Sequence, residues 1–170
     1  VTGVQTCALP ICWTVRACGR DASRAPSGAE FVQADLHESA IVRQLVDGVD
    51  TVIHLAARVH VMRDSAKDPL DEFRRANVAV TDRLGAAARV AGARQFIYAS
   101  SIKALGESTS QMPFSENSPY DPQDPYGVSK MEAEQVLLAH SGEFFQPTIF
   151  RLPLTYGPGV GGNFRSEEHT

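Results

Sequence analysis

Short runs of apolar and β-branched residues recur along the chain, and stretches with helical spacing separate them. Such runs predict β-strands. The run at 51–56 is apolar at nearly every position, which is typical of a strand buried on both faces of a parallel sheet. The predicted strands cover residues 13–18, 30–34, 51–56, 95–99 and 148–151.

Three stretches carry apolar residues at the spacing of an amphipathic helix. They cover residues 39–46, 69–91 and 126–140, and a glycine follows each of them (Gly48, Gly92 and Gly142). Glycine is common just beyond a helix end. Strands that alternate with helices predict an α/β fold with a doubly wound parallel sheet. No internal repeat or domain linker interrupts the pattern.

Composition narrows the class of protein. The chain has 170 residues, of which 43% are hydrophobic, so it can build one domain with a core. Its net charge of -4 argues against a nucleic-acid partner. No apolar run is long enough to span a membrane, and no signal peptide is visible. Cys7, Cys12 and Cys18 lack metal-site spacing and favour a reducing, cytoplasmic compartment.

The two ends of the chain resemble an in-frame translation of a sequencing-library adapter. We predict that residues 1–11 and 165–170 are not native and that the authentic segment is 12–164. Val1-Thr2-Gly3 imitates the start of a dinucleotide-binding strand, but Thr6 and Leu9 stand where further glycines are needed. A crossover to the strand at Trp13 would also need at least about 10–12 residues.

The strongest candidate for chemistry is a tyrosine and a lysine at one helix start. Asp124 is a good N-cap and Pro125 suits the first helical position. Tyr126 and Lys130 are four residues apart, so they share a face, and Leu137 continues that face inward. A neighbouring ammonium group would lower the phenol pKa from about 10, so that it exchanges a proton near neutral pH. The alternative is a packing tyrosine beside a lysine whose amine reaches solvent.

Other polar residues fall where a parallel sheet binds ligands. Ser100 and Ser101 lie at the carboxyl end of a predicted strand, and they could contact a ligand or cap backbone groups. Asn77 falls on the apolar stripe of its helix, where a buried amide braces the fold or supports a site. His54 lies within an apolar run and is interpreted as a core histidine. The proline-rich segment 102–125 has the length of a substrate-facing loop.

The predicted strand ends also suggest cofactor contacts. Arg20 and Asp21 follow the strand at 13–18; an acid there would hold the adenosine ribose of NAD, and an arginine would suit the 2′-phosphate of NADP. The choice stays open, as does a plain solvated turn. Asp35 could bind adenine or cap the next helix. The small side chain of Ala57 would let a cofactor approach the backbone.

Taken in order, these residues resemble the extended short-chain dehydrogenase/reductase family in its NAD-dependent epimerase/dehydratase branch. The resemblance covers nearly all of 13–164, and UDP-glucose 4-epimerase-like and UDP-N-acetylquinovosamine dehydrogenase-like members match best. Its landmarks are Asp35-Leu36, His54-Leu-Ala-Ala57, Asn77-Val78, Ser100-Ser101 with Gly106, Tyr126-x-x-x-Lys130 and Arg151-x-Pro153-x-x-Tyr156-Gly-Pro158.

The resemblance implies roles for individual residues. Tyr126 would be the acid/base, Lys130 would hold the ribose of the nicotinamide nucleotide and lower the Tyr126 pKa, and Ser101, rather than Ser100, would bond the reacting hydroxyl. Asn77 would support this site. The remaining implied contacts are Arg20, Asp35, Leu36, Ala56, Ala57 and Pro153 for NAD or NADP, and Asn163 with Ser101 and Tyr126 for the nucleotide-sugar substrate.

The resemblance also implies what is missing and which functions remain. We expect a truncated Rossmann-like domain that lacks its first strand, its glycine-rich loop and the substrate lobe. Ile102-Lys103 follows Ser101 where dehydratases carry Asp-Glu, which argues against a dehydratase. The expected function is an NAD(P)-dependent epimerase or dehydrogenase of a UDP-sugar, acting as a homodimer. Alternatives are a non-catalytic NAD(P)-sensing module or a reductase of a non-sugar substrate.

Overall fold

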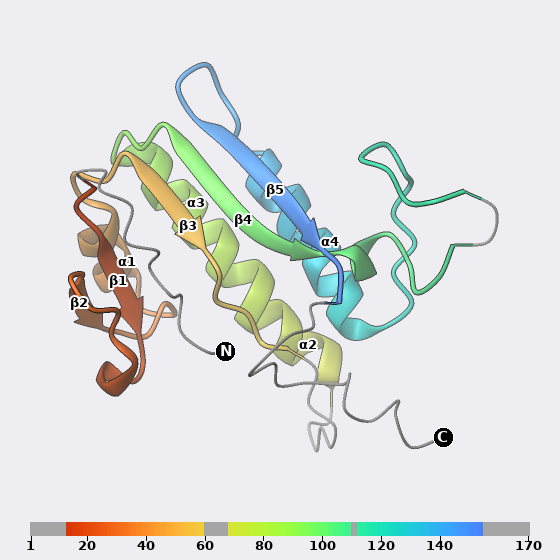
Figure 1. The fold of residues 1–170 in the computed structure, drawn as a ribbon, viewed down its shortest axis with the longest axis horizontal. Coiled ribbons are helices and arrows are strands. Elements are labelled where there is room, and N and C mark those ends of the chain that lie inside the picture. Colours follow the sequence, from red (N-terminus) through yellow and green to blue (C-terminus); the bar gives the residue numbers. More distant parts are fainter. Residues whose placement is uncertain (1–12, 60–67, 110–111, 155–170) are drawn as a thin grey trace.

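The structure of the chain is a computed structural model that describes residues 13–59, 68–109 and 112–154. Five parallel strands alternate with helices, as the sequence predicts (Figure 1). The strands are β1 (Arg16–Gly19), β2 (Glu30–Gln33), β3 (Thr51–His54), β4 (Gln95–Ser101) and β5 (Gln146–Leu152). The main helices are α1 (Ser39–Val46), α2 (Pro69–Phe73), α3 (Ala79–Val90) and α4 (Pro125–Leu138).

The strands form two separate parallel sheets in the described part of the chain. β1 pairs with β2, and β3, β4 and β5 pair in that order. In a doubly wound sheet of order 3-2-1-4-5-6, the first strand lies between the second and the fourth. β1 and β3 correspond to those two neighbours. The division of the sheet is therefore what the predicted lack of the central strand would produce.

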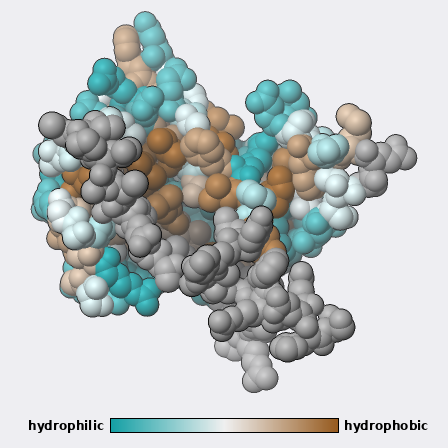
Figure 2. All heavy atoms as spheres, in the orientation of Figure 1, coloured by the Kyte–Doolittle hydropathy of each residue, from teal (hydrophilic) through white to brown (hydrophobic). Residues whose placement is uncertain are grey.

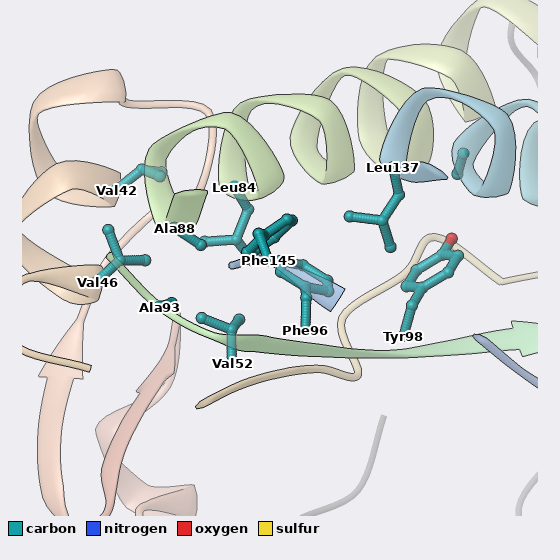
Figure 3. Packing of buried hydrophobic residues seen from close by; sticks show 11 residues of the cluster. Val42, Val46, Val52, Leu84, Ala88, Ala93, Phe96, Tyr98, Leu137 and Phe145 are labelled. Carbon is teal, nitrogen blue, oxygen red and sulfur yellow. The ribbon is translucent and has the colours of Figure 1, made fainter. Parts of the chain in front are cut away.

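The core lies between the larger sheet and its helices. α3 and α4 cover one face of β3, β4 and β5 (Figure 1). Side chains of Val52, Phe96 and Tyr98 stand on this face and reach toward Leu84 and Leu137 of the helices (Figure 3). α1 adds Val42 and Val46 to the same cluster, which connects the small sheet to the large one.

The opposite face of the larger sheet carries apolar side chains that no described helix covers. Ile53 of β3 is 60% exposed and Phe150 of β5 is 52% exposed. Hydrophobic residues gather on the viewed face of the molecule over these strands (Figure 2). Apolar side chains on both faces explain why the 51–56 run lacks the polar alternation of a half-buried strand.

The predicted helix at 69–91 is interrupted. α2 ends at Phe73, a π-helical stretch covers Arg74–Val78, and α3 begins at Ala79. Widened π-turns occur mostly as single turns and are frequent at functional sites. Here the stretch holds Asn77, which is 1% exposed. Residue spacing alone did not reveal this break, because a single wide turn leaves the apolar stripe in place.

Two local predictions are confirmed. α4 begins at Pro125, and Asp124 caps it by accepting a 2.5 Å hydrogen bond from the Gly127 amide. His54 is a core residue, 2% exposed, whose ring stacks on Tyr98 and bonds the Thr81 hydroxyl at 3.1 Å. Among the described residues, no helix is both long and apolar enough to cross a membrane.

Candidate active site

Tyr126 lies in the first turn of α4, beside the carboxyl end of β4. Its ring is half-buried and meets Phe73 edge-on, with 6.0 Å between the ring centroids. Burial raises the pKa of Tyr126, while the side chain of Ser101 acts to lower it. The prediction of a lowered Tyr126 pKa is therefore wrong for this structure. The physical reason is that desolvation penalises the phenolate more than its neighbours stabilise it.

Lys130 lies one helical turn further on, but its ammonium group points into the core. The side chain is 1% exposed, Nζ donates a 2.7 Å hydrogen bond to the Ala99 carbonyl, and it lies over the Tyr98 ring. Burial lowers the pKa of Lys130 to about 8, and the charge of Glu134 opposes that shift. The alternative in which the amine reaches solvent is excluded.

The two serines at the end of β4 face different partners. The hydroxyl of Ser100 is buried and donates to the Glu134 carboxylate. Ser101 is half-buried; it interacts with Tyr126, and its oxygen accepts a 3.3 Å hydrogen bond from the Lys103 amide. Ser101 thus combines contact with the tyrosine and capping of the turn that follows.

A close backbone contact brings Tyr126 next to this turn. A Cβ on Gly127 would lie 2.6 Å from the Lys103 carbonyl oxygen, so only glycine fits. The Lys103 ammonium bonds Asp124 and Glu107, each at 2.8 Å. These contacts hold the helix start against the end of β4, which is what brings Ser101 and Tyr126 together.

Asn77 braces the site from the side of α3. Its amide oxygen accepts a 2.7 Å hydrogen bond from the Arg58 backbone amide, and its nitrogen donates to the Arg58 carbonyl at 3.1 Å. The same nitrogen donates to the Ser129 hydroxyl at 2.9 Å, next to Lys130. Asn77 therefore links the segment after β3 to α4, which confirms that the buried amide braces the fold. Its support of a catalytic site stays a prediction.

The predicted adenosine contacts lie on the smaller sheet. Arg20 and Asp35, at the carboxyl ends of β1 and β2, line a shallow hollow of about 350 Å³ that is widely open to solvent. Asp35 also accepts a 2.9 Å hydrogen bond from the His37 amide, so it caps the local turn as well. Leu36 is partly buried and packs against the core. Asp21, the residue after Arg20, instead accepts hydrogen bonds from the Ser23 amide and hydroxyl.

The remaining predicted contacts flank the larger sheet. Ala56 and Ala57 follow β3, and Pro153 follows β5 and is exposed. All three therefore lie beyond carboxyl ends of parallel strands, the same edge at which Ser101 ends β4. Asn163 lies outside the described residues, as do the adapter-like ends. No group of three His, Cys, Asp or Glu side chains in the described part of the chain could hold a metal ion.

Sequence reasoning missed one buried group. Glu134, one turn beyond Lys130, is 0% exposed, and its carboxylate accepts hydrogen bonds from three other side chains. The donors are Ser100 of β4, Tyr120 of the segment before α4, and Arg151 of β5. The spacing of Lys130 and Glu134 placed both on one helix face and could have signalled a second buried charge.

Comparison with known proteins gives the family. Residues 10–170 match the NAD dependent epimerase/dehydratase family. A UDP-glucose 4-epimerase from Vibrio cholerae is 36% identical over 96% of this chain and 50% of its own length. A dTDP-D-glucose 4,6-dehydratase from Mus musculus is 37% identical over 76% of this chain and 36% of its own length.

Solved structures agree with this match. MoeE5 in complex with UDP-glucuronic acid and NAD superimposes with a TM-score of 0.73 at 31% identity, covering 91% of this chain and 51% of that one. The UDP-Glc/GlcNAc 4-epimerase from Campylobacter jejuni gives a TM-score of 0.65 at 30% identity, over 74% and 38%. The chain thus spans no more than half of the length of the Vibrio cholerae and Mus musculus relatives. The chain belongs to the NAD-dependent epimerase/dehydratase family.

Proposed function

We propose that the full-length protein is an NAD-dependent epimerase or dehydrogenase of a nucleotide-diphosphate sugar, with UDP-sugars as the substrate class. "Full-length" here means a protein that carries this segment over the whole length of its relatives. The observation that supports this proposal most directly is that Tyr126 interacts with Ser101 at the carboxyl end of β4. The buried Lys130 follows Tyr126 by one helical turn. The names of the relatives support the sugar-nucleotide class.

The residues present suit a dinucleotide at both ends of the site. Arg20 and Asp35 line the hollow on the smaller sheet, where a carboxylate and a guanidinium suit ribose and phosphate groups. Lys130 would hold the ribose at the nicotinamide end, for which its buried ammonium has to turn from the Ala99 carbonyl toward the site. Pro153 would lie beside the nicotinamide. The MoeE5 structure described above contains NAD. Asp21, the residue after Arg20, is engaged with Ser23 and does not line the hollow. When bound, the cofactor supplies the hydride acceptor.

Side chains of this chain bind the reacting hydroxyl and accept its proton. Ser101 forms a hydrogen bond with the reacting sugar hydroxyl, and Tyr126 accepts the proton of that hydroxyl while the carbon that bears it loses a hydride. In the free site burial raises the Tyr126 pKa, against the opposing effects of Ser101 and of the Lys103 charge. Contacts formed when cofactor and substrate bind must therefore favour the phenolate during the reaction. Asn77 keeps α4 in place through Ser129.

Lys103 argues against dehydration. Dehydratases of this family are expected to carry an acid that protonates the leaving hydroxyl in the pair after the serine. Here the second of these positions holds an ammonium group, fixed by Asp124 and Glu107. A cation with two carboxylate partners cannot act as that carboxylic acid.

Turnover of the full-length protein tests the proposal. We would incubate it with NAD or NADP and UDP-glucose, UDP-glucuronic acid or dTDP-glucose, and follow sugars by NMR and reduced cofactor by absorbance. An epimer without net NADH identifies an epimerase, and an oxidised sugar with stoichiometric NADH identifies a dehydrogenase. A 4-keto-6-deoxy product, or no reaction with any of the three, would contradict the proposal. Homodimer formation and a cytoplasmic location stay predictions, which sedimentation and cell fractionation check.

A further inference from the structure

A single carboxylate joins the elements that carry the proposed site. Glu134 is completely buried in α4. One of its oxygens accepts from the Ser100 hydroxyl, and the other accepts from the Tyr120 hydroxyl at 2.8 Å. Arg151 of β5 donates to it through Nε at 3.0 Å and Nη2 at 2.9 Å. A buried carboxylate is tolerated only with such a complete set of donors.

Each partner of Glu134 is a near neighbour of a site residue. Ser100 precedes Ser101 in β4, Tyr120 lies in the segment 112–124 that leads to Tyr126, and Lys130 is one turn before Glu134. Arg151 also donates to the Glu116 carbonyl at 3.1 Å, and its guanidinium lies over the Tyr120 ring. The carboxylate therefore ties α4 to β4, to β5 and to the segment before the helix.

Charge provides a second connection. The groups around Lys130 are His54 of β3, Tyr98 of β4 and Glu134 of its own helix. His54 is neutral above a pKa of about 3, and burial raises the pKa of Tyr98, so neither is an anion near neutral pH. Glu134 is therefore the negative group in this set, and its carboxylate also accepts hydrogen bonds from Arg151 and Tyr120.

We propose that Glu134 is a positioning residue for the Ser101, Tyr126 and Lys130 site: its carboxylate fixes α4 against β4, β5 and the segment 112–124, and it places a buried negative charge one helical turn from Lys130. This inference rests on the proposed function for its effect on turnover. Its effect on Lys130 can be measured without turnover. A carboxylate one helical turn from Lys130 favours the charged form of the lysine, so the ionisation of Lys130 reports whether this negative charge is present, and the split between kcat and KM reports the positioning.

The test replaces the carboxylate by an amide in the full-length protein. Glu134→Gln should lower kcat by about 100-fold with little change in KM, because small displacements of reacting groups are costly. The loss of activity at high pH, where Lys130 gives up its proton, should move to lower pH by about one pH unit. Glu132→Gln is the matched control, because Glu132 is on the same helix and pairs with Arg74 at the surface. It should change neither quantity.

NMR titration of lysine side chains labelled with ¹³C at Cε gives the readout that does not need activity, because the buried Lys130 amine does not have to react with a reagent. The chain has three lysines, Lys67, Lys103 and Lys130, and the Lys130→Arg variant identifies the Lys130 signal. The titration midpoint of Lys130 should fall in Glu134→Gln and stay unchanged in Glu132→Gln. An unchanged midpoint in a folded Glu134→Gln protein overturns the proposal, even if its melting temperature falls. An inactive wild type with the shifted midpoint would contradict the proposed function and leave the role of Glu134 supported.

A second variant, Glu134→Asp, keeps the proposal testable if Glu134→Gln does not fold. Glu134→Asp keeps the charge but shortens the side chain by one methylene group. It should lower kcat at least about 10-fold while the high-pH loss of activity and the Lys130 midpoint stay where they are. Wild-type kcat in Glu134→Asp would overturn the positioning role.

Discussion

The ammonium group of Lys130 lies 4.2 Å from the centroid of the Tyr98 ring. Both side chains are 1% exposed, so the contact is shielded from water. A cation over the face of an aromatic ring is stabilised by about 2 kcal/mol or more when desolvated. The Tyr98 ring therefore stabilises the charged form of Lys130, which burial alone would disfavour.

Two substitutions of Tyr98 distinguish the contribution of its ring to stability from that of its hydroxyl. The hydroxyl is buried, has the Thr81 side chain as its polar neighbour, and makes no hydrogen bond of normal geometry with the described residues. Tyr98→Phe should therefore change the free energy of unfolding by less than about 0.5 kcal/mol or stabilise the protein. Tyr98→Leu, which loses the ring, should cost about 2–4 kcal/mol. Urea unfolding of the full-length protein compares the two variants, and equal losses would contradict this account.

Removing the hydroxyl of Tyr126 should abolish most turnover without unfolding the protein. Tyr126→Phe keeps the ring and its edge contact with Phe73. Because the group that exchanges the proton is lost, we expect kcat to fall by about 100- to 10,000-fold. Thermal melting and NAD titration serve as controls and should match the wild type. Near-normal turnover would refute the acid/base role and the role given to Lys130.

Adding one methyl group at Gly127 should disturb the helix start. In Gly127→Ala the new Cβ would lie 2.6 Å from the Lys103 carbonyl oxygen, a backbone atom that cannot move freely. We expect a loss of about 1–3 kcal/mol and a drop in kcat. Gly142→Ala is the matched control, because its Cβ would meet only Arg89 at 3.8 Å. Melting curves of both variants check this, and equal stability would argue against the close contact.

Stability should fall as the pH drops from about 6.5 towards 3 because of His54. Burial, with a contribution from the charge of Lys130, lowers the pKa of folded His54 to about 3. The unfolded chain binds the proton near 6.5, so it holds more protons in this window, and folding weakens by up to about 1.4 kcal/mol per pH unit. His54→Gln should flatten this slope and the exposed His37→Gln should not. Equal slopes in urea unfolding between pH 7 and 5 would contradict the assignment.

The chain of 170 residues alone should self-associate and bind NAD poorly. β1 and β3 each leave a strand edge unpaired by described residues, and Ile53 exposes apolar surface on β3. Phe150 exposes more apolar surface on β5, on the same face of the larger sheet. Such edges favour aggregation. Sedimentation at rising concentration and calorimetric titration of NAD and NADP measure both effects. A soluble, cooperatively melting chain with micromolar cofactor affinity would show this prediction to be wrong.

One substitution tests the cause of that association. Ile53→Lys places a charge on the uncovered face of β3 and should reduce aggregation. Val90→Lys is the control, because Val90 is an isolated exposed residue of α3, 89% accessible. Equal improvement by both variants would point to net charge rather than to the sheet face.

The sequence alone determined the features that depend on neighbouring residues. Strand and helix positions followed from short periodic runs, and the start of α4 followed from Asp124 and Pro125. The spacing of Tyr126 and Lys130 placed them on one helix face. These features need only backbone propensity and periodicity. The strand order, in which β1 and β3 do not pair with each other, was instead expected from the resemblance to a doubly wound family whose central strand is missing here.

The tertiary structure decided where the charges lie and how they titrate. Lys130 turns toward Tyr98 and the Ala99 carbonyl, and burial raises rather than lowers the Tyr126 pKa. Glu134 gains its role only because β4, β5 and the segment before α4 bring donors to it from distant parts of the chain. Desolvation and hydrogen bonding depend on contacts between elements that the local pattern does not encode. A pKa therefore becomes defined only when the elements have packed.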